Sequence, residues 1–150
     1  MVSRALIDDF LAQRTLALAG VSRSGKGFGN AVRRELGARG YTLKLIHPEA
    51  DSIGGQPCVH ALREVAPEVG GVVLVTPPAE TLKLLREAQE AGIRRVWIQE
   101  GAESDAAIAF CGEHGLAAVH HECILMFIER AAWPHRLHRA IRGAFGHLPT

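Results

Sequence analysis

The residues best suited to chemistry lie in a glycine-rich stretch near the start of the chain. Within ten residues it contains four glycines, which are Gly20, Gly25, Gly27 and Gly29. Arg23 and Lys26 stand between them, an apolar run precedes them, and a helical pattern begins at about Asn30. A strand, a glycine turn and a helix in this order direct backbone N–H groups and a helix N-terminus toward one point, which favours a phosphate. A plain tight turn needs neither four glycines nor two cations, so the sequence predicts a phosphate-binding loop.

A nucleoside triphosphate is the first ligand to consider for such a loop. The GxxxxGK portion of the NTPase motif is present, but Gly27 follows Lys26 where magnesium coordination needs a serine or threonine hydroxyl. The apolar run at 71–75 also ends in Thr76 rather than in the aspartate that holds the metal in such enzymes. An NTPase is therefore disfavoured.

A dinucleotide or coenzyme A is the remaining choice. Ser22 occupies the position of the middle glycine of the GxGxxG motif, which lets a pyrophosphate approach the backbone. The second predicted strand ends in His47 and Pro48 instead of the acid that binds ribose hydroxyls. NAD or NADP stays open, because a cation there suits a phosphorylated ribose. Coenzyme A carries more phosphate and needs no such acid, so Arg23 and Lys26 suit it.

Other chemistry finds little support in the sequence. His120 and His121 stand beside an acid and a cysteine, but adjacent residues of a strand point to opposite faces. We therefore predict that this pair does not chelate a metal, and no metal site is expected. The sequence shows no Ser/His/Asp order, no paired carboxylates and no activated thiol, so no catalytic residue is predicted.

An alternation of strands and helices must position these residues. Apolar runs predict five strands, at 15–19, 42–46, 71–75, 96–98 and 116–119. Helical spacing predicts six helices, at about 3–13, 29–39, 61–65, 79–91, 104–114 and 134–145. Ser3 and Ser104 are the expected N-caps. Residues 49–57 are predicted to form a loop, and 124–128 fit either a strand or a helix.

This alternation predicts an α/β fold of three layers, in which a five-stranded parallel sheet carries helices on both faces. In such a sheet ligands bind beyond the carboxyl ends of the strands, where the strand order reverses. Four strand ends have unusual chemistry and would share that edge, at 20–29, 47–48, 76–78 and 99–101. We expect the function to lie there.

Composition bounds the class of protein. The 150 residues predict a single domain, and the net charge of +1 gives no reason to expect a nucleic-acid or membrane surface. No apolar run reaches the roughly 18 residues of a membrane helix, and residues 1–13 do not resemble a signal peptide. The three cysteines, Cys58, Cys111 and Cys123, are widely spaced and are expected to be reduced thiols. A cytoplasmic location is therefore predicted.

Four segments resemble the small stand-alone CoA-binding proteins, whose fold is similar to the N-terminal domain of the succinyl-CoA synthetase α subunit. The segments are LAGVSRSGKGFGNAV at 18–32, IHPEADSIGGQPCV at 45–59, VVLVTPPAETLKLLREAQEAGIRRVWIQEGAES at 72–104 and HHECILMFIE at 120–129. They cover most of 15–129 in the family's order and spacing. The TPP turn followed by a helix and then WIQEGAES is the most specific part. The resemblance implies a Rossmann-like fold and coenzyme A as the ligand.

The resemblance also implies individual roles. The residues that would wrap the diphosphate are Gly20, Val21, Ser22, Lys26, Gly27, Phe28 and Gly29. Lys26 would pair its charge, and Arg23 joins the predicted site for its own charge beside the glycine turn. His47 and Pro48, in place of the family's Asn-Pro, would lie near the adenosine. The turn lining the adenine or pantetheine side would be Thr76, Pro77 and Pro78. The end of the crevice would be formed by Gln99, Gly101 and Ala102.

Succinyl-CoA synthetases need a phosphorylated histidine from a second domain and a partner subunit, neither of which is expected of this chain. The predicted function is therefore non-catalytic binding of coenzyme A or an acyl-CoA. An NAD(P)-binding oxidoreductase-like protein and an interaction module without ligand are the alternatives. The basic helix at 134–145 lies outside the resemblance. It is expected to pack on the sheet edge, and a homodimer contact through it stays open.

Overall fold

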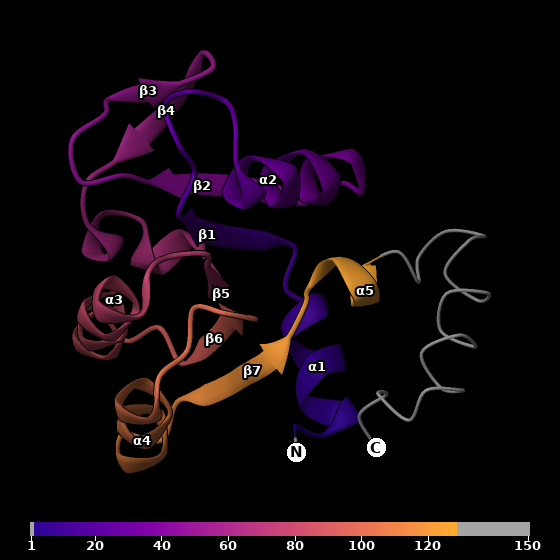
Figure 1. Cartoon of the computed structure of the whole chain (residues 1–150), viewed down its shortest axis with the longest axis vertical. Helices are drawn as coiled ribbons and strands as arrows, with labels where there is room; N and C mark the ends of the chain where they lie inside the picture. Colours follow the sequence, from indigo (N-terminus) through magenta and orange to yellow (C-terminus); the bar gives the residue numbers. More distant parts are fainter. Residues whose placement is uncertain (1, 129–150) are drawn as a thin grey trace.

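The computed structural model describes residues 2–128, so the predicted helix at 134–145 lies outside the described residues. Within them, one sheet runs through the molecule in the order β3-β4-β2-β1-β5-β6-β7 (Figure 1). Its strands are β1 (Thr15–Ala19), β2 (Thr42–Ile46), β3 (Ser52–Ile53), β4 (Gln56–Val59), β5 (Gly71–Leu74), β6 (Arg95–Gln99) and β7 (Ala117–Glu122). Every pair of neighbours is parallel except β3 and β4. The predicted α/β class and layering are confirmed.

Helices cover both faces of this sheet. They are α1 (Arg4–Leu11), α2 (Phe28–Ala38), α3 (Pro78–Ala91), α4 (Asp105–Glu113) and α5 (Leu125–Ile128), with 3-10 turns at Leu62–Glu64 and Ala66–Glu68. Side chains of α1, α2 and α5 share one apolar core with Leu16 and Leu18. Side chains of α3, α4 and the first 3-10 turn share the other with Ala17 and Ala19. Alternate residues of β1 thus serve the two cores, as the period-2 geometry of a strand requires.

Local signals in the sequence set the helix ends. Ser3 Oγ accepts from the Leu6 N–H at 3.2 Å, and Ser104 Oγ accepts from the Ala107 N–H at 3.1 Å, so both predicted N-caps are confirmed. Helix α3 begins with Pro78 at its first position and ends at Gly92, whose φ is +82°. The predicted helix at 61–65 is instead a single 3-10 turn, and the ambiguous run at 124–128 contains the short helix α5.

The stretch predicted to be a loop forms two more strands, so the sheet has seven strands instead of five. β3 and β4 form a hairpin through Gly54 and Gly55, with φ of +55° and +80°, the left-handed values that a tight two-residue turn needs. β4 pairs in parallel with β2. Arg33 of α2 fastens the hairpin by donating to the Ile53 carbonyl at 3.1 Å and to Gln56 Oε1 at 3.0 Å.

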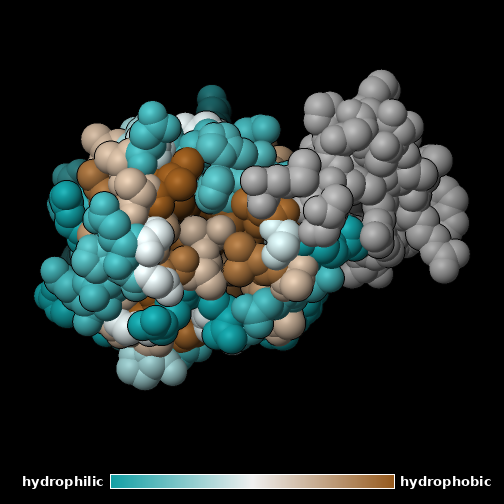
Figure 2. All heavy atoms as spheres, turned by 90° about the horizontal axis from the view of Figure 1, so that it is seen from below, coloured by the Kyte–Doolittle hydropathy of each residue, from teal (hydrophilic) through white to brown (hydrophobic). Residues whose placement is uncertain are grey.

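The surface is mixed in character. Figure 2 views the molecule from below Figure 1 and shows apolar residues gathered in the middle of that face, with hydrophilic residues along its borders. Within residues 2–128, the exposed large apolar side chain is Phe28, which is 44% exposed at the start of α2. No helix in this part of the chain is long and apolar enough to cross a membrane.

Candidate functional site

Two glycines hold the start of α2 against the end of β1. Gly20 has a φ of +108°, and a Cβ there would lie 2.0 Å from the carbonyl oxygen of Val75. Gly29, in the first turn of α2, approaches so closely that its Cβ would lie 2.1 Å from the carbonyl oxygen of Gly20. Any side chain at either position collides with backbone, so both contacts require glycine. They bring the N-terminus of α2 to the carboxyl end of β1.

That N-terminus carries backbone donors and no side-chain cap. Gly27 is the N-cap residue, with φ +92°, and the Ala31 N–H makes the bond to its carbonyl at 3.3 Å. The first turn therefore leaves the N–H groups of Phe28, Gly29 and Asn30 without an acceptor inside the helix. Such a group of donors at the positive end of the helix dipole favours an anion.

The remainder of the glycine loop is braced from within. The buried side chain of Asn30 donates from Nδ2 to the carbonyls of Lys26 at 2.7 Å and Ser22 at 3.2 Å. Ser24 Oγ accepts from the Lys26 N–H, and Ser22 Oγ from the Ser24 N–H. The backbone N–H groups of residues 24–26 thus donate hydrogen bonds to acceptors within the loop itself. Asn30, whose buried amide braces the loop, was not among the predicted site residues.

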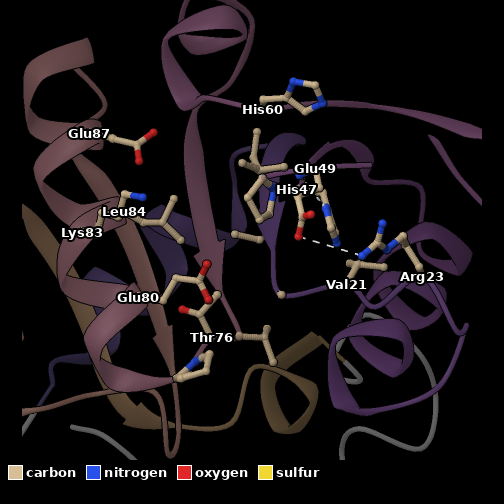
Figure 3. Close-up of a pocket in the computed structure, with 16 residues that line it drawn as sticks. Val21, Arg23, His47, Glu49, His60, Thr76, Glu80, Lys83, Leu84 and Glu87 are labelled. Atoms are coloured by element: carbon tan, nitrogen blue, oxygen red, sulfur yellow. Dashed lines mark hydrogen bonds and ion pairs between the residues drawn. The ribbon is translucent and has the colours of Figure 1, made fainter. Parts of the chain in front are cut away.

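A cleft of about 350 Å³ opens beside this loop, at the carboxyl ends of β1, β2 and β5 (Figure 3). Seven of the predicted site residues line it: Gly20, Val21, Arg23, His47, Pro48, Thr76 and Pro77. The other lining residues were not among the predicted site residues; they are Ala19, Ile46, Glu49, His60, Val75, Glu80, Lys83, Leu84 and Glu87. The strand order does reverse here, since β1 lies between β2 and β5.

Helix α3 forms one side of the cleft, and a buried threonine pair positions it. Thr76, just after β5, and Thr81 of α3 place their hydroxyl oxygens 2.7 Å apart, and Thr81 Oγ1 also lies 3.3 Å from the Thr76 carbonyl. This contact ties the first turns of α3 to the chain just after β5, and so helps to set the direction of the helix. Glu80 and Lys83 therefore line the cleft instead of pointing away from it.

His47 caps the turn that follows β2. Its Nδ1 accepts from the N–H groups of Glu49 at 3.0 Å and Ala50 at 2.8 Å. An asparagine side chain can make the same kind of bond to the backbone two residues on, so His47 closes this turn as an asparagine could. Because Nδ1 accepts two bonds, the neutral ring carries its proton on Nε2, which leaves a donor for the cleft.

Substitution of His47 tests this capping role. Alanine leaves the buried Ala50 N–H without its acceptor, so we expect a loss of about 1–3 kcal/mol in the free energy of unfolding. Asparagine keeps an acceptor at the right distance along the chain, so His47→Asn should lose less than half as much. Urea unfolding of the two variants measures the difference, and equal losses would contradict the capping role.

Other predicted site residues lie outside the cleft. Ser22, Lys26, Gly27, Phe28, Gly29 and Pro78 do not line it, although all but Pro78 belong to the adjoining loop or helix start. Gln99 is 3% exposed, and its Oε1 accepts from the Ile124 N–H at 3.0 Å. Ala102 is buried in the core beside α4, and the Gly101 N–H donates to the Glu103 carboxylate. Gln99 and Ala102 thus hold the polypeptide beyond β6, away from the cleft.

The geometric argument about His120 and His121 is wrong. His121 has a φ of +59°, which turns its ring back so that the two Nδ1 atoms lie 2.8 Å apart. Burial, with His121 nearby, lowers the pKa of His120 below its ordinary value. Residues 2–128 nevertheless contain no group of three or more histidine, cysteine or acidic side chains that could hold a metal.

Burial keeps two of the three cysteines, Cys58 and Cys111, from being activated nucleophiles. Cys58, Cys111 and Cys123 are free thiols. Burial raises the pKa of the Cys111 thiol to about 11 and also raises that of Cys58. Both thiols therefore stay protonated near neutral pH, which is the unreactive form.

Comparisons with solved structures agree with this fold. A conserved hypothetical protein from Pyrococcus furiosus is 33% identical, with a TM-score of 0.71 over 75% of this chain and 97% of its own. A hypothetical protein from Pyrococcus horikoshii is 22% identical, with a TM-score of 0.78 over 87% of this chain and 92% of its own. The dinucleotide-forming acetyl-coenzyme A synthetase 1 of Ca. Korarchaeum cryptofilum is 19% identical, with a TM-score of 0.60 over 71% of this chain and 25% of its own.

The family of this chain follows from its match to a family model. The model described as a CoA binding domain matches residues 14–129, which span the glycine loop, the cleft and the sheet to the end of α5. This chain belongs to the CoA-binding domain family.

Proposed function

We propose that this chain binds coenzyme A, or an acyl-CoA, without catalysing a reaction of its own. The observation that carries the proposal is the close packing of Gly20 and Gly29, which holds the uncapped N-terminus of α2 beside the cleft. The diphosphate would lie over that N-terminus, with Lys26 beside it, and the adenosine would occupy the cleft near His47. Membership of the CoA-binding domain family supports this ligand.

The cleft contains cations that could pair with the phosphates of a ligand, although Glu49, Glu80 and Glu87 line it as well. Arg23 and Lys83 line it, and the Nε2–H of His47 adds a donor. His47 and Pro48, rather than the acid that binds a dinucleotide's ribose hydroxyls, directly follow β2, and the nearest acid, Glu49, lies 3.9 Å from Arg23. These features favour coenzyme A, with its 3′-phosphate, over NAD. NADP also carries a phosphate on a ribose, so the affinity for coenzyme A has to be compared with the affinity for NADP.

The lack of catalysis is also part of the proposal. The thiols of Cys58 and Cys111 stay protonated near neutral pH, and residues 2–128 hold no group of three or more metal-ligating side chains. Neither nucleic acid nor membrane is proposed as a partner, given the net charge of +1. The three free cysteines accord with a cytoplasmic protein. A homodimer is not proposed, because the helix expected to form it lies outside the described residues.

A thermal-shift titration of the whole chain with coenzyme A, dephospho-coenzyme A, NAD, NADP and ATP tests the ligand class. A ligand at about a hundred times its Kd stabilises the folded state by about 2.7 kcal/mol, so coenzyme A should raise the melting temperature. A smaller shift with dephospho-coenzyme A would indicate that the 3′-phosphate is bound. A shift with NADP alone would favour an oxidoreductase-like protein, and no shift with any ligand would favour an interaction module.

The variant Lys26→Glu tests the site within that ligand class. Lys26 is exposed, so the fold should be unaffected while coenzyme A binds about tenfold or more weakly, because a cation beside the diphosphate becomes an anion. Arg34→Glu is the matched control, since it makes the same charge change on the exposed side of α2, away from the cleft. Isothermal titration calorimetry measures both. Equal affinities for the two variants would remove Lys26 from the site.

A further inference from the structure

One ion pair joins the two loops on the side of the cleft opposite α3. Arg23 Nη2 of the glycine loop lies 3.9 Å from Glu49 Oε1, which follows β2 (Figure 3). Both residues line the cleft. The cation that a phosphate would use is therefore already facing a carboxylate of the same chain.

The position of Glu49 is fixed by its own backbone. His47 Nδ1 accepts from the Glu49 N–H and from the Ala50 N–H, and Ala50 is buried. The turn therefore holds the Cα of Glu49 at the rim of the cleft. The carboxylate stands within reach of Arg23 without further ordering of the backbone.

The pair itself is weak. The side chains of Arg23 and Glu49 are 61% and 73% exposed, and pairs of this kind contribute about 0–1 kcal/mol. A phosphate accepts charge-assisted, bidentate bonds from a guanidinium, which are stronger. A ligand with two linked phosphates can thus displace Glu49 from Arg23, whereas a weaker anion gains less from doing so.

We propose that Glu49 is a built-in competitor for Arg23, which lowers the affinity of the cleft and makes occupation of Arg23 depend on ligand charge. This inference rests on the proposed function, since the competing ligand is the diphosphate of coenzyme A. Pantetheine, which has the arm but no phosphate, would leave the Arg23–Glu49 pair in place. Glu49 is then a residue that sets specificity without touching the ligand.

A double-mutant cycle on the full chain tests the competition. Calorimetry with coenzyme A compares the unmodified chain with Glu49→Gln, Arg23→Gln and the double variant. We expect Glu49→Gln to bind about two- to fivefold more tightly, because at most about 1 kcal/mol of pairing is released. In the Arg23→Gln background the same change should give a smaller gain, and the difference is the coupling. Raising the salt concentration should shrink the gain.

Glu87→Gln is the matched control, because Glu87 lines the same cleft from α3 and its removal changes only the general charge. An equal gain from Glu87→Gln, an equal gain in both Arg23 backgrounds, or weaker binding by Glu49→Gln would overturn the proposal. The experiment distinguishes failure of the proposed function from failure of the role given to Glu49. If the unmodified chain does not bind coenzyme A, the proposed function fails and the competition with it; if it binds without coupling, only the role of Glu49 is lost.

Discussion

Alanine at position 20 is expected to leave the chain without a stable native state. The added Cβ would lie 2.0 Å from the carbonyl oxygen of Val75 and 2.6 Å from its carbonyl carbon, and the φ of +108° is strained for any residue with a side chain. The atoms it meets belong to the backbone at the end of β5, which cannot move without breaking the sheet. We expect a loss of more than about 4 kcal/mol, a large part of a typical folding free energy.

Two further glycine variants separate the causes of that loss. Gly29→Ala should also be severe, because its Cβ would meet the Gly20 carbonyl oxygen at 2.1 Å, although Gly29 does not have a positive φ. Gly37→Ala is the control: its Cβ would have no neighbour within 4 Å, so it should stabilise α2 by about 0.5–1 kcal/mol. Urea unfolding and soluble yield measure all three. A Gly20→Ala variant as stable as the unmodified chain would refute the close approach.

Alanine in place of Trp97 is expected to cost about 3–5 kcal/mol of unfolding free energy. Trp97 is fully buried in the middle of β6, and its ring centroid lies 5.5 Å from that of Phe10 and 5.8 Å from that of Phe127. It therefore joins α1, the sheet and α5 in one core. Its Nε1–H also donates to the Glu122 carbonyl at 3.1 Å, where β7 ends.

The variant Trp97→Phe separates packing from the hydrogen bond. Phenylalanine fills part of the volume but cannot donate to Glu122, so an intermediate loss is expected in chemical unfolding. A residue that contacted adenine would behave differently, with weakened coenzyme binding and a fold of nearly normal stability. That pattern for Trp97→Ala would contradict the core role assigned here.

Much of the architecture follows from local sequence signals. Apolar runs predict five of the seven strands, and the serines at the start of α1 and α4 predict their caps because an N-cap is a property of a few adjacent residues. The β3–β4 hairpin was missed because its strands are too short to show alternation. The hairpin also receives hydrogen bonds from Arg33, some twenty residues earlier, which donates to Ile53 and Gln56. Such a contact is not visible in a local pattern.

The site is less predictable than the fold for the same reason. The glycine loop and the turns after β2 and β5 are identifiable because their residue types are unusual. Glu80, Lys83 and Glu87 instead resemble the solvated side of an ordinary helix, and the way α3 packs after the Thr76–Thr81 contact brings them to the cleft. Gln99 resembles a ligand contact but is used as an internal acceptor for Ile124. The ring contact of His120 and His121 depends on one left-handed residue that strand geometry does not anticipate.

The buried amide of Asn30 has a consequence for the energetics of recognition. Because it ties the carbonyls of Ser22 and Lys26 together in the free protein, little conformational freedom is left for a ligand to remove. An anion arriving at the start of α2 would meet donors already in place. Free and occupied forms of this loop should then superpose closely, as they do in preorganised complexes.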